Sequence, residues 1–402
     1  MSTEIHPSND TRAQGTDLGR GSWTPAATPR RGPARARLRR LHRWLGVSAG
    51  ALLIVTGLSG SLLVFRQEID AALNPHLLRT EPAATRVPLQ QILNGVRQQY
   101  ADPAPTRVRM PRSRDATYEV WLGAAPERYV YADPYRGTLL GARRPTEFLT
   151  GWLFLLHSHL LAGAVGGQVA GVGALALVLL SVTGLVIWWP RRAPWRAWMQ
   201  WRASLTVARG VGGRRLTFDV HRAVGFYASA LLFVGGLTGA SLAFPKAGER
   251  VASWVTLSPT ARAPLAPASR AIAPMLPVDS LLLIAERAQP GGEISYLYLP
   301  SAPGQPFRVR KRLPRERHPN GKSFVSVDPI TGQVLGVEDG TTAPRGARLY
   351  SLLYPLHIGE IGGAPTRLLA SLTGLTLPLL AVTGLIQWWR RRRPDRVRTS
   401  GD

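Results

Sequence analysis

The chain contains no cysteine among its 402 residues, and acidic residues are scarce. Without cysteine, a disulfide scaffold, a thiolate metal site and a cysteine nucleophile are all excluded. The 50 Lys and Arg residues outnumber the 24 Asp and Glu residues, for a formal net charge of +26. Such a balance points to nucleic acid or to an anionic surface, and the position of the basic residues decides between them.

Charge is also absent from four apolar runs, at residues 44–65, 169–189, 223–244 and 368–389. A membrane-spanning helix needs about 20 largely apolar residues. A charge in the middle of the bilayer costs roughly 3 kcal/mol on insertion scales, so uncharged runs are typical of membrane spans. The sequence therefore predicts an α-helical integral membrane protein with transmembrane segments at 41–66, 157–190, 218–245 and 357–390.

Arginine is concentrated beside these segments. Residues 30–43 hold seven Arg and no acid, residues 190–222 eight Arg and one Asp, and residues 390–398 six Arg and one Asp. Basic loops stay on the cytoplasmic side, so both termini are predicted to be cytoplasmic. Topology and contact with the lipid bilayer then account for the basic charge, and a nucleic-acid partner is not expected.

The segments outside the membrane follow from this topology. Residues 1–40 are predicted to be a disordered basic cytoplasmic tail behind a retained signal anchor. Residues 191–217 form a basic cytoplasmic loop and residues 391–402 a basic cytoplasmic tail. The segments 67–150 and 246–350 have mixed charge and are predicted to form two small α+β lobes outside the membrane.

The two halves of the chain repeat each other. His42-Arg43 aligns with His221-Arg222 at an offset of 179, which also brings Gly57-Leu58-Ser59-Gly60 onto Gly236-Leu237-Thr238-Gly239. At an offset of 200, Leu156-His157 aligns with Leu356-His357, and Thr183-Gly184-Leu185 with Thr383-Gly384-Leu385. Two parallel two-helix repeats about an axis along the membrane normal are expected, with small residues where the helices approach.

The outer segments repeat as well. Asp133-Pro134-Tyr135-Arg136-Gly137 matches Asp328-Pro329-Ile330-Thr331-Gly332, and alternating apolar residues precede each motif. This pattern predicts a β-hairpin with an Asp-Pro-x-x-Gly turn in each lobe. Apolar residues three and four apart predict a helix upstream, at 89–100 and 278–288.

Four of the eight histidines fall at equivalent positions of the repeat. His42 and His221 are predicted at the cytoplasmic ends of spans, and His157 and His357 at the outer ends. A single histidine at this depth is usually only a polar residue at the headgroups. Neutral imidazole is a ligand for iron, copper or zinc, and no acidic or cysteine residue stands nearby to complete a zinc or copper shell. Paired axial ligation of haem is therefore the preferred interpretation.

The spacing predicts a mechanism. The 23 residues from His42 to Phe65 span about 35 Å of helix, so the two pairs would lie on opposite sides of the bilayer. Two haems so placed would carry electrons across the membrane. His159, two residues after His157, is either an alternative ligand or a group behind the ligand. His6, His76 and His318 have no counterparts and are expected at the surface.

A basic cluster marks the second lobe, and alternation along a strand would place three of its members on one face. Solvation or contact with lipid headgroups is one interpretation, and a dock for an anionic substrate is the other. The cluster comprises Arg308, Arg310, Lys311, Arg312, Arg315 and Arg317.

Together, these motifs resemble the PepSY-associated transmembrane family over roughly residues 38–393. The resemblance rests on the His-Arg-x-x-Gly opening of the first span, the Leu-His opening and Thr-Gly-Leu-x-x-Trp-Trp close of spans two and four, and the Asp-Pro-x-x-Gly lobes. Members include bacterial iron-regulated inner-membrane proteins and ferric-siderophore reductases, which carry b-type haem between membrane histidines and have two outer PepSY lobes.

The resemblance implies that His42, His221, His157 and His357 are haem ligands for two b-type haems in the bacterial inner membrane, with His159 an alternative to His157. It also implies an oxidoreductase that passes electrons to a ferric siderophore or another iron complex in the periplasm. No G-x-G-x-x-G follows a strand, so the electron donor is expected to be another molecule.

Two other functions stay open. PepSY lobes are also associated with the regulation of peptidases, so the chain would then be a membrane-anchored binding module. The repeat symmetry also suggests a transporter of the iron complex. A binding module would be colourless, and a transporter would move its substrate without redox turnover.

Overall fold

The computed structural model describes residue 3 and residues 33–123, 128–189, 201–202, 204–260, 266–271 and 273–392. Three parts of the predicted cytoplasmic segments lie outside the described residues, as does His6. They are nearly all of the N-terminal tail before residue 33, residues 191–200 and 203 of the loop, and residues 393–402.

Four helices of the described chain are long and apolar enough to cross a membrane. They are α1 (Pro33–Leu63), α6 (Gly163–Trp188), α8 (Gly213–Ala243) and α12 (Ala364–Arg392). Apolar side chains on their outer surfaces are open, Val172 at 59% and Leu372 at 52%, as lipid-facing residues are. The described part of the chain thus has the four long apolar helices that the prediction of four spans requires. Helix α1 begins at Pro33, so the end of the tail predicted to be disordered is helical.

The four helices form a closed bundle in which α6 packs on α8, α1 on α12, α1 on α6 and α8 on α12. Small residues allow the closest approach. A Cβ built on Gly57 of α1 would lie 2.8 Å from the carbonyl oxygen of Gly374 in α12. Beside it, the Ser61 hydroxyl donates to the carbonyl of Ser371 at 2.9 Å.

Spans two and four each begin later than predicted. His157 belongs to a separate helix, α5 (Leu149–His159), which precedes α6, and His357 belongs to α11 (Arg345–His357), which precedes α12. Left-handed residues end the first helix of each pair, since Leu160 has φ +48° and Gly359 φ +73°. The predicted continuous spans from 157 and 357 are therefore wrong at their outer ends.

Eight strands form one antiparallel sheet in the order β4-β3-β2-β1-β5-β6-β7-β8. The strands are β1 (Pro105–Arg109), β2 (Tyr118–Leu122), β3 (Arg128–Ala132), β4 (Leu139–Arg143), β5 (Glu293–Tyr298), β6 (Phe307–Arg312), β7 (Ser323–Val327) and β8 (Val334–Glu338). The two outer segments meet where β1 pairs with β5, with Val108 opposite Leu297. The expected pair of separate lobes is thus joined into a single sheet.

One face of this sheet carries the main core. Val108, Val120, Leu297 and Val309 are completely buried against the predicted helices, α4 (Leu89–Gln99) and α10 (Val278–Ala288). The carboxylate of Asp279 in α10 accepts the backbone N–H groups of the first two residues of α4, both at 2.9 Å. This cap holds the helices of the two halves together.

The two predicted hairpins are present, and their aspartates form the turns. The Asp133 carboxylate accepts the backbone N–H of Tyr135 at 2.7 Å between β3 and β4, and that of Asp328 accepts the N–H of Ile330 at 2.8 Å between β7 and β8. Gly137 closes the first turn with φ +73°, a conformation that glycine adopts without strain.

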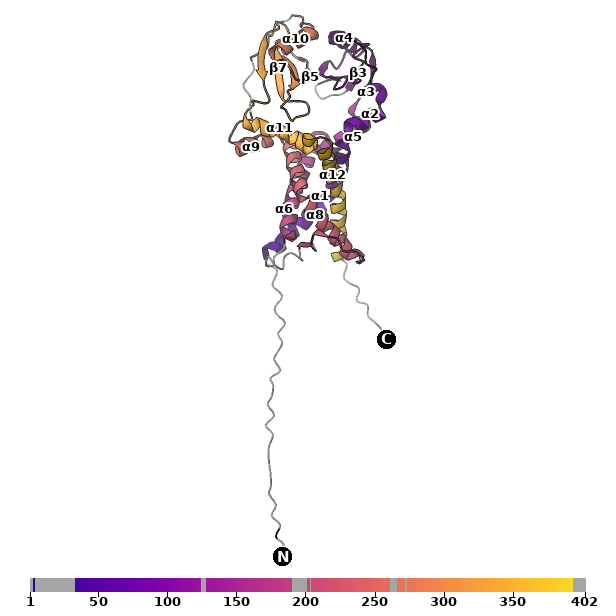
Figure 1. Ribbon diagram of the computed structural model, residues 1–402, viewed down its shortest axis with the longest axis vertical. Coiled ribbons are helices and arrows are strands. Elements are labelled where there is room, and N and C mark those ends of the chain that lie inside the picture. The colour runs from indigo at the N-terminus through magenta and orange to yellow at the C-terminus, as the bar shows by residue number, and fades with distance from the viewer. Residues whose placement is uncertain are drawn as a thin grey trace.

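The sheet caps one end of the bundle (Figure 1). Helices α4 and α10 lie on the side of the sheet away from the bundle, and α5 and α11 lie at the junction. Short helices complete this region: α2 (Arg66–Leu73), α3 (Pro75–Leu78), α9 (Pro245–Thr256) and the 3-10 turns Pro145–Glu147 and Glu360–Gly362. Helix α1 begins, and helix α12 ends, at the opposite end of the bundle.

His318 connects the sheet to the junction, and its predicted place at the surface is wrong. It is only 6% exposed, and its ring stacks on Tyr354 of α11 with the centroids 5.3 Å apart. Its Nδ1 accepts the backbone N–H of Asn320 at 3.1 Å. Burial and the neighbouring cations, Arg310 first among them, lower the pKa of His318 to about 2.

The buried His318 should make the stability of the protein sensitive to pH. The folded protein keeps the ring neutral, whereas the unfolded chain protonates it below about pH 6.5, so the unfolded state binds more protons in acid. Stability should therefore fall below pH 6.5, by about 1.4 kcal/mol at pH 5.5. Thermal unfolding of wild type and His318→Gln at pH 7.5 and 5.5 measures this, and equal pH dependence of the two proteins would contradict it.

Candidate functional site

His42 and His221 lie together at the end of the bundle away from the sheet. His42 is on α1 and His221 on α8, and their ring centroids are 6.4 Å apart with the ring planes at 90°. Both side chains are half-buried. We refer to these two residues as the terminal-side pair.

His157 and His357 lie together at the other end of the bundle, beneath the sheet. They come from the last residues of α5 and α11, and their ring centroids are 6.0 Å apart with the planes at 48°. We refer to these two residues as the sheet-side pair. The structure therefore brings the four repeat-equivalent histidines together as two pairs, one at each end of the bundle.

Each of the four rings is held by a hydrogen bond from Nδ1 to a different helix. Thr183 of α6 contacts His42 at 2.8 Å, Thr383 of α12 contacts His221 at 2.9 Å, and Thr238 of α8 contacts His357 at 3.0 Å, all through the threonine hydroxyl. For the fourth ring, Nδ1 of His157 lies 2.9 Å from the carbonyl oxygen of Thr56 in α1.

These partners determine which ring nitrogen carries the proton. A carbonyl only accepts, so His157 donates through Nδ1. The hydroxyls of Thr183, Thr238 and Thr383 each donate their single proton to a carbonyl four residues earlier in the helix, at 2.6–2.7 Å. They can then only accept from histidine. In all four rings Nδ1 is the donor and Nε2 keeps a free lone pair, the state in which a neutral imidazole binds a metal.

A glycine beside each ring makes room for it. A Cβ built on Gly60 would lie 2.7 Å from Cε1 of His157, and the corresponding distance is 3.1 Å from Gly239 to His357. For the terminal-side pair, Gly184 and Gly384 give 3.2 and 3.3 Å. The repeated Ser/Thr-Gly motifs thus serve the histidines, a role that sequence reasoning missed when it assigned small residues to helix contact alone.

The spacing of the ring centroids in both pairs leaves room for one metal ion between two rings. Because a metal–imidazole bond is about 2.0–2.1 Å long, two imidazoles on opposite sides of one ion have ring centroids about 6 Å apart. The observed 6.4 and 6.0 Å agree with this spacing. Among the residues that the structure describes, no group of three or more His, Asp or Glu is placed to hold a metal.

The remaining described histidines lie apart from the pairs. Nδ1 of His159 hydrogen-bonds to the hydroxyl of Ser158 at 2.6 Å, and the ring lies against Gly167 of α6 rather than against His357. His76 is exposed on α3, as predicted. The structure therefore favours His157 over His159 as the partner of His357.

The predicted basic cluster is divided between the two faces of β6. Lys311 is completely buried on the core face, where it pairs with Glu286 at 2.6 Å. Arg308 and Arg310 lie on the other face, and Arg308 pairs with Glu338 at 2.8 Å. Arg312, Arg315 and Arg317 are exposed. The predicted alternation of 308, 310 and 312 is confirmed, whereas the cluster as one solvated patch is wrong.

Arg308 and Arg310 belong to a face of aromatic and arginine side chains that looks toward α5 and α11. The guanidinium of Arg107 lies over the rings of Trp121 and Tyr298, at 4.5 and 4.6 Å from their centroids. Arg308 lies 4.6 Å over Phe324. Period-two alternation in β1, β2, β5 and β7 predicts which residues of each strand share a face. Only the pairing of β1 with β5 brings the residues of the two halves onto one surface.

Gly60→Ala tests the packing of the sheet-side pair. The new Cβ would push the His157 ring away from Thr56 and overpack the site, so we expect the protein to lose about 1–3 kcal/mol relative to a matched control. The control is Gly235→Ala in α8, where a Cβ would have no neighbour within 4 Å among the described residues. Thermal unfolding in detergent compares them, and equal stability of the two variants would refute the assigned packing.

Comparison with known proteins identifies the family. No curated protein is similar enough to this chain to count as a match. The family model described as the PepSY-associated TM region matches residues 39–391, from α1 to the end of α12. This match includes all four histidines and the whole sheet. The chain therefore belongs to the PepSY-associated transmembrane family.

Proposed function

We propose that this protein transfers electrons across the bacterial inner membrane through two b-type haems and reduces the iron of a ferric siderophore outside the cytoplasm. The observation that carries the proposal is the pairing of four histidines at two levels of one bundle, at 6.4 and 6.0 Å. Two parallel two-helix repeats would supply one histidine each to both sites.

The residues present fit haem. Each pair offers two neutral Nε2 atoms, and the second nitrogen of every ring is bonded to the protein, as is usual for metal-binding histidines. When bound, haem iron supplies one-electron redox chemistry between its ferric and ferrous states. The chain itself would hold the rings, keep Nε2 unprotonated and surround the site with apolar helices.

The depth of the two pairs supports transfer across the membrane. On α1, 18 residues separate His42 from Gly60, which contacts the ring of His157, and this corresponds to about 27 Å along the helix axis. The hydrocarbon core of a bilayer is about 30 Å thick. The two pairs would thus lie near its opposite faces.

The arginine-rich ends of α1, α8 and α12 support a cytoplasmic location for both termini and for the terminal-side pair. The sheet would then be extracytoplasmic, next to the sheet-side pair. Electrons would enter from a donor on the cytoplasmic side or in the membrane. That donor would lose one electron for every ferric ion reduced.

The face of aromatic and arginine side chains is the substrate surface we propose. Guanidinium groups bind anionic oxygen ligands, and the half-buried rings of Trp121, Tyr298 and Phe324, each with a guanidinium stacked over it, add flat apolar surface that suits planar chelating groups. One electron converts the chelated Fe(III) to Fe(II). Hard oxygen chelators hold Fe(II) more weakly, so reduction would release the iron.

The test is an absorption spectrum of the purified protein, oxidised and reduced by dithionite, with a pyridine haemochrome assay. We expect two haems b per chain, and we expect anaerobic addition of a ferric siderophore to reoxidise them while ferrous iron appears in a ferrozine assay. A colourless protein, even after expression with added haem, would overturn the proposal and favour the peptidase-regulating module.

Single variants test the terminal-side pair and the sheet-side pair separately. His42→Ala should leave one haem that still reacts with the siderophore but no longer receives electrons from the cytoplasmic side of a proteoliposome. His357→Ala should leave one haem that no longer reacts. His76→Ala, which removes an exposed histidine far from both pairs, should behave as wild type. Loss of both haems in His76→Ala would contradict the assignment.

Thr383→Val should raise the reduction potential of the terminal-side haem alone. The threonine accepts from Nδ1 of His221, which makes the ring more basic, so a bound haem iron would be stabilised in its ferric state. Losing a bond of about 1 kcal/mol corresponds to about 40 mV for one electron. Redox titration measures the shift. Thr376→Val in the same helix is the control and should leave both potentials unchanged, because among the described residues the Thr376 hydroxyl bonds only to the carbonyl of Thr373.

A further inference from the structure

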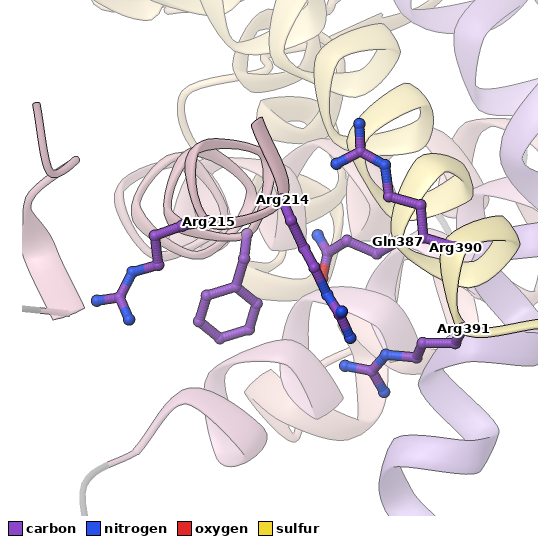
Figure 2. A pocket seen from close by; sticks show the side chains of 6 residues that line it. Arg214, Arg215, Gln387, Arg390 and Arg391 are labelled. Carbon is purple, nitrogen blue, oxygen red and sulfur yellow. The ribbon is translucent and has the colours of Figure 1, made fainter. Parts of the chain in front are cut away.

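A basic pocket lies between α8 and α12 at the end of the bundle away from the sheet. The cavity is about 360 Å³. It is lined by Arg214, Arg215, Phe218, Gln387, Arg390 and Arg391. In Figure 2 the side chains of Arg214 and Arg391 extend toward each other near Gln387, while Arg215 points away.

Most of the positive charge of this pocket is uncompensated. Arg215 pairs with the buried carboxylate of Asp219 at 2.9 Å. Within the described residues, Arg214, Arg390 and Arg391 make no hydrogen bond or ion pair, and the buried side-chain nitrogen of Gln387 has no acceptor. Three cations and an unused donor therefore share one cavity, an arrangement that an anionic oxygen ligand stabilises.

The first half of the chain uses the equivalent arginine differently. Arg35, the counterpart of Arg214, donates to the carbonyls of Val186, Ile187 and Trp189 where α6 ends. Helix α12 continues to Arg392, so the equivalent carbonyls of Ile386 and Gln387 lie inside a helix and are bonded there. The pocket is thus a departure of the second half from the first.

The depth of the pocket in the bundle points to lipid headgroups as the source of the anion. Phe218 lies one turn before His221 on α8, and Gln387 one turn beyond Thr383 on α12, so the pocket lies just outside the terminal-side pair, at the level of the headgroups. Trp389 is 55% exposed and Arg392 stacks on Trp388 at 4.2 Å, as in an aromatic belt at a membrane interface. Basic pockets between helices at this level bind phospholipid headgroups.

We propose that this pocket binds the phosphate of an anionic phospholipid. Arg214 and Arg391 contact the phosphate oxygens, Gln387 donates its amide N–H, and Phe218 lies beside the acyl chains. The site is independent of haem and of electron transfer.

The test is native mass spectrometry of the full-length protein in detergent with phosphatidylglycerol or phosphatidylcholine. Wild type should retain phosphatidylglycerol in preference to phosphatidylcholine. The double variant Arg214→Ala/Arg391→Ala should retain at least about tenfold less phosphatidylglycerol than wild type. Arg37→Ala removes an exposed arginine of α1 at the same end of the bundle, and this variant should retain phosphatidylglycerol as wild type does. Arg214→Gln, a milder change, should give an intermediate loss if the double variant does not fold.

Several outcomes would contradict the proposed phospholipid site. Equal retention of the two lipids, or unchanged retention in the double variant, would show that the pocket does not select the phosphate. Displacement of the lipid by millimolar inorganic phosphate would assign the pocket to a free anion. Loss of haem without loss of lipid in the double variant would assign the arginines to the cofactor. His42→Ala/His221→Ala should keep the lipid, so failure of the haem proposal would leave this result unchanged.

Discussion

The arrangement of the bundle depends on four hydrogen bonds that run from histidine Nδ1 to a neighbouring helix. Because each acceptor is a carbonyl, or a hydroxyl whose proton is already used, every ring takes the same tautomer. The bonds also join helices, since His42 links α1 to α6 and His221 links α8 to α12. The same hydrogen bonds thus orient the four rings and hold neighbouring helices of the bundle together.

The sheet and the sheet-side pair are connected through the junction helices. α5 follows β4 and carries His157 in its last turn, while α11 follows β8 and ends at His357. Because β1 pairs with β5, the strands that lead to both helices belong to one rigid sheet. The stack of His318 on Tyr354 adds a direct contact between that sheet and α11. A ligand bound to the sheet's face of aromatic and arginine side chains would therefore lie close to the sheet-side pair.

The two halves differ where their surroundings differ. At the end of α6, Arg35 donates to three carbonyls that no N–H group of the described helix reaches. At the end of α12 the helix itself satisfies them, which releases Arg214 and leaves a pocket with excess positive charge. A few residues of extra helix thus convert a structural contact into a candidate binding site.

The sequence by itself determined the four membrane helices, the two Asp-Pro-x-x-Gly hairpins and the four repeat-equivalent histidines, because hydropathy, turn chemistry and repeated motifs are properties of local sequence. Only the tertiary structure decided the pairing of β1 with β5, the burial of His318 and the role of the Ser/Thr-Gly motifs. His157 meets Thr56 across 101 residues of chain, and His221 meets Thr383 across 162. Contacts of this kind depend on how separate segments pack, and no local pattern specifies them.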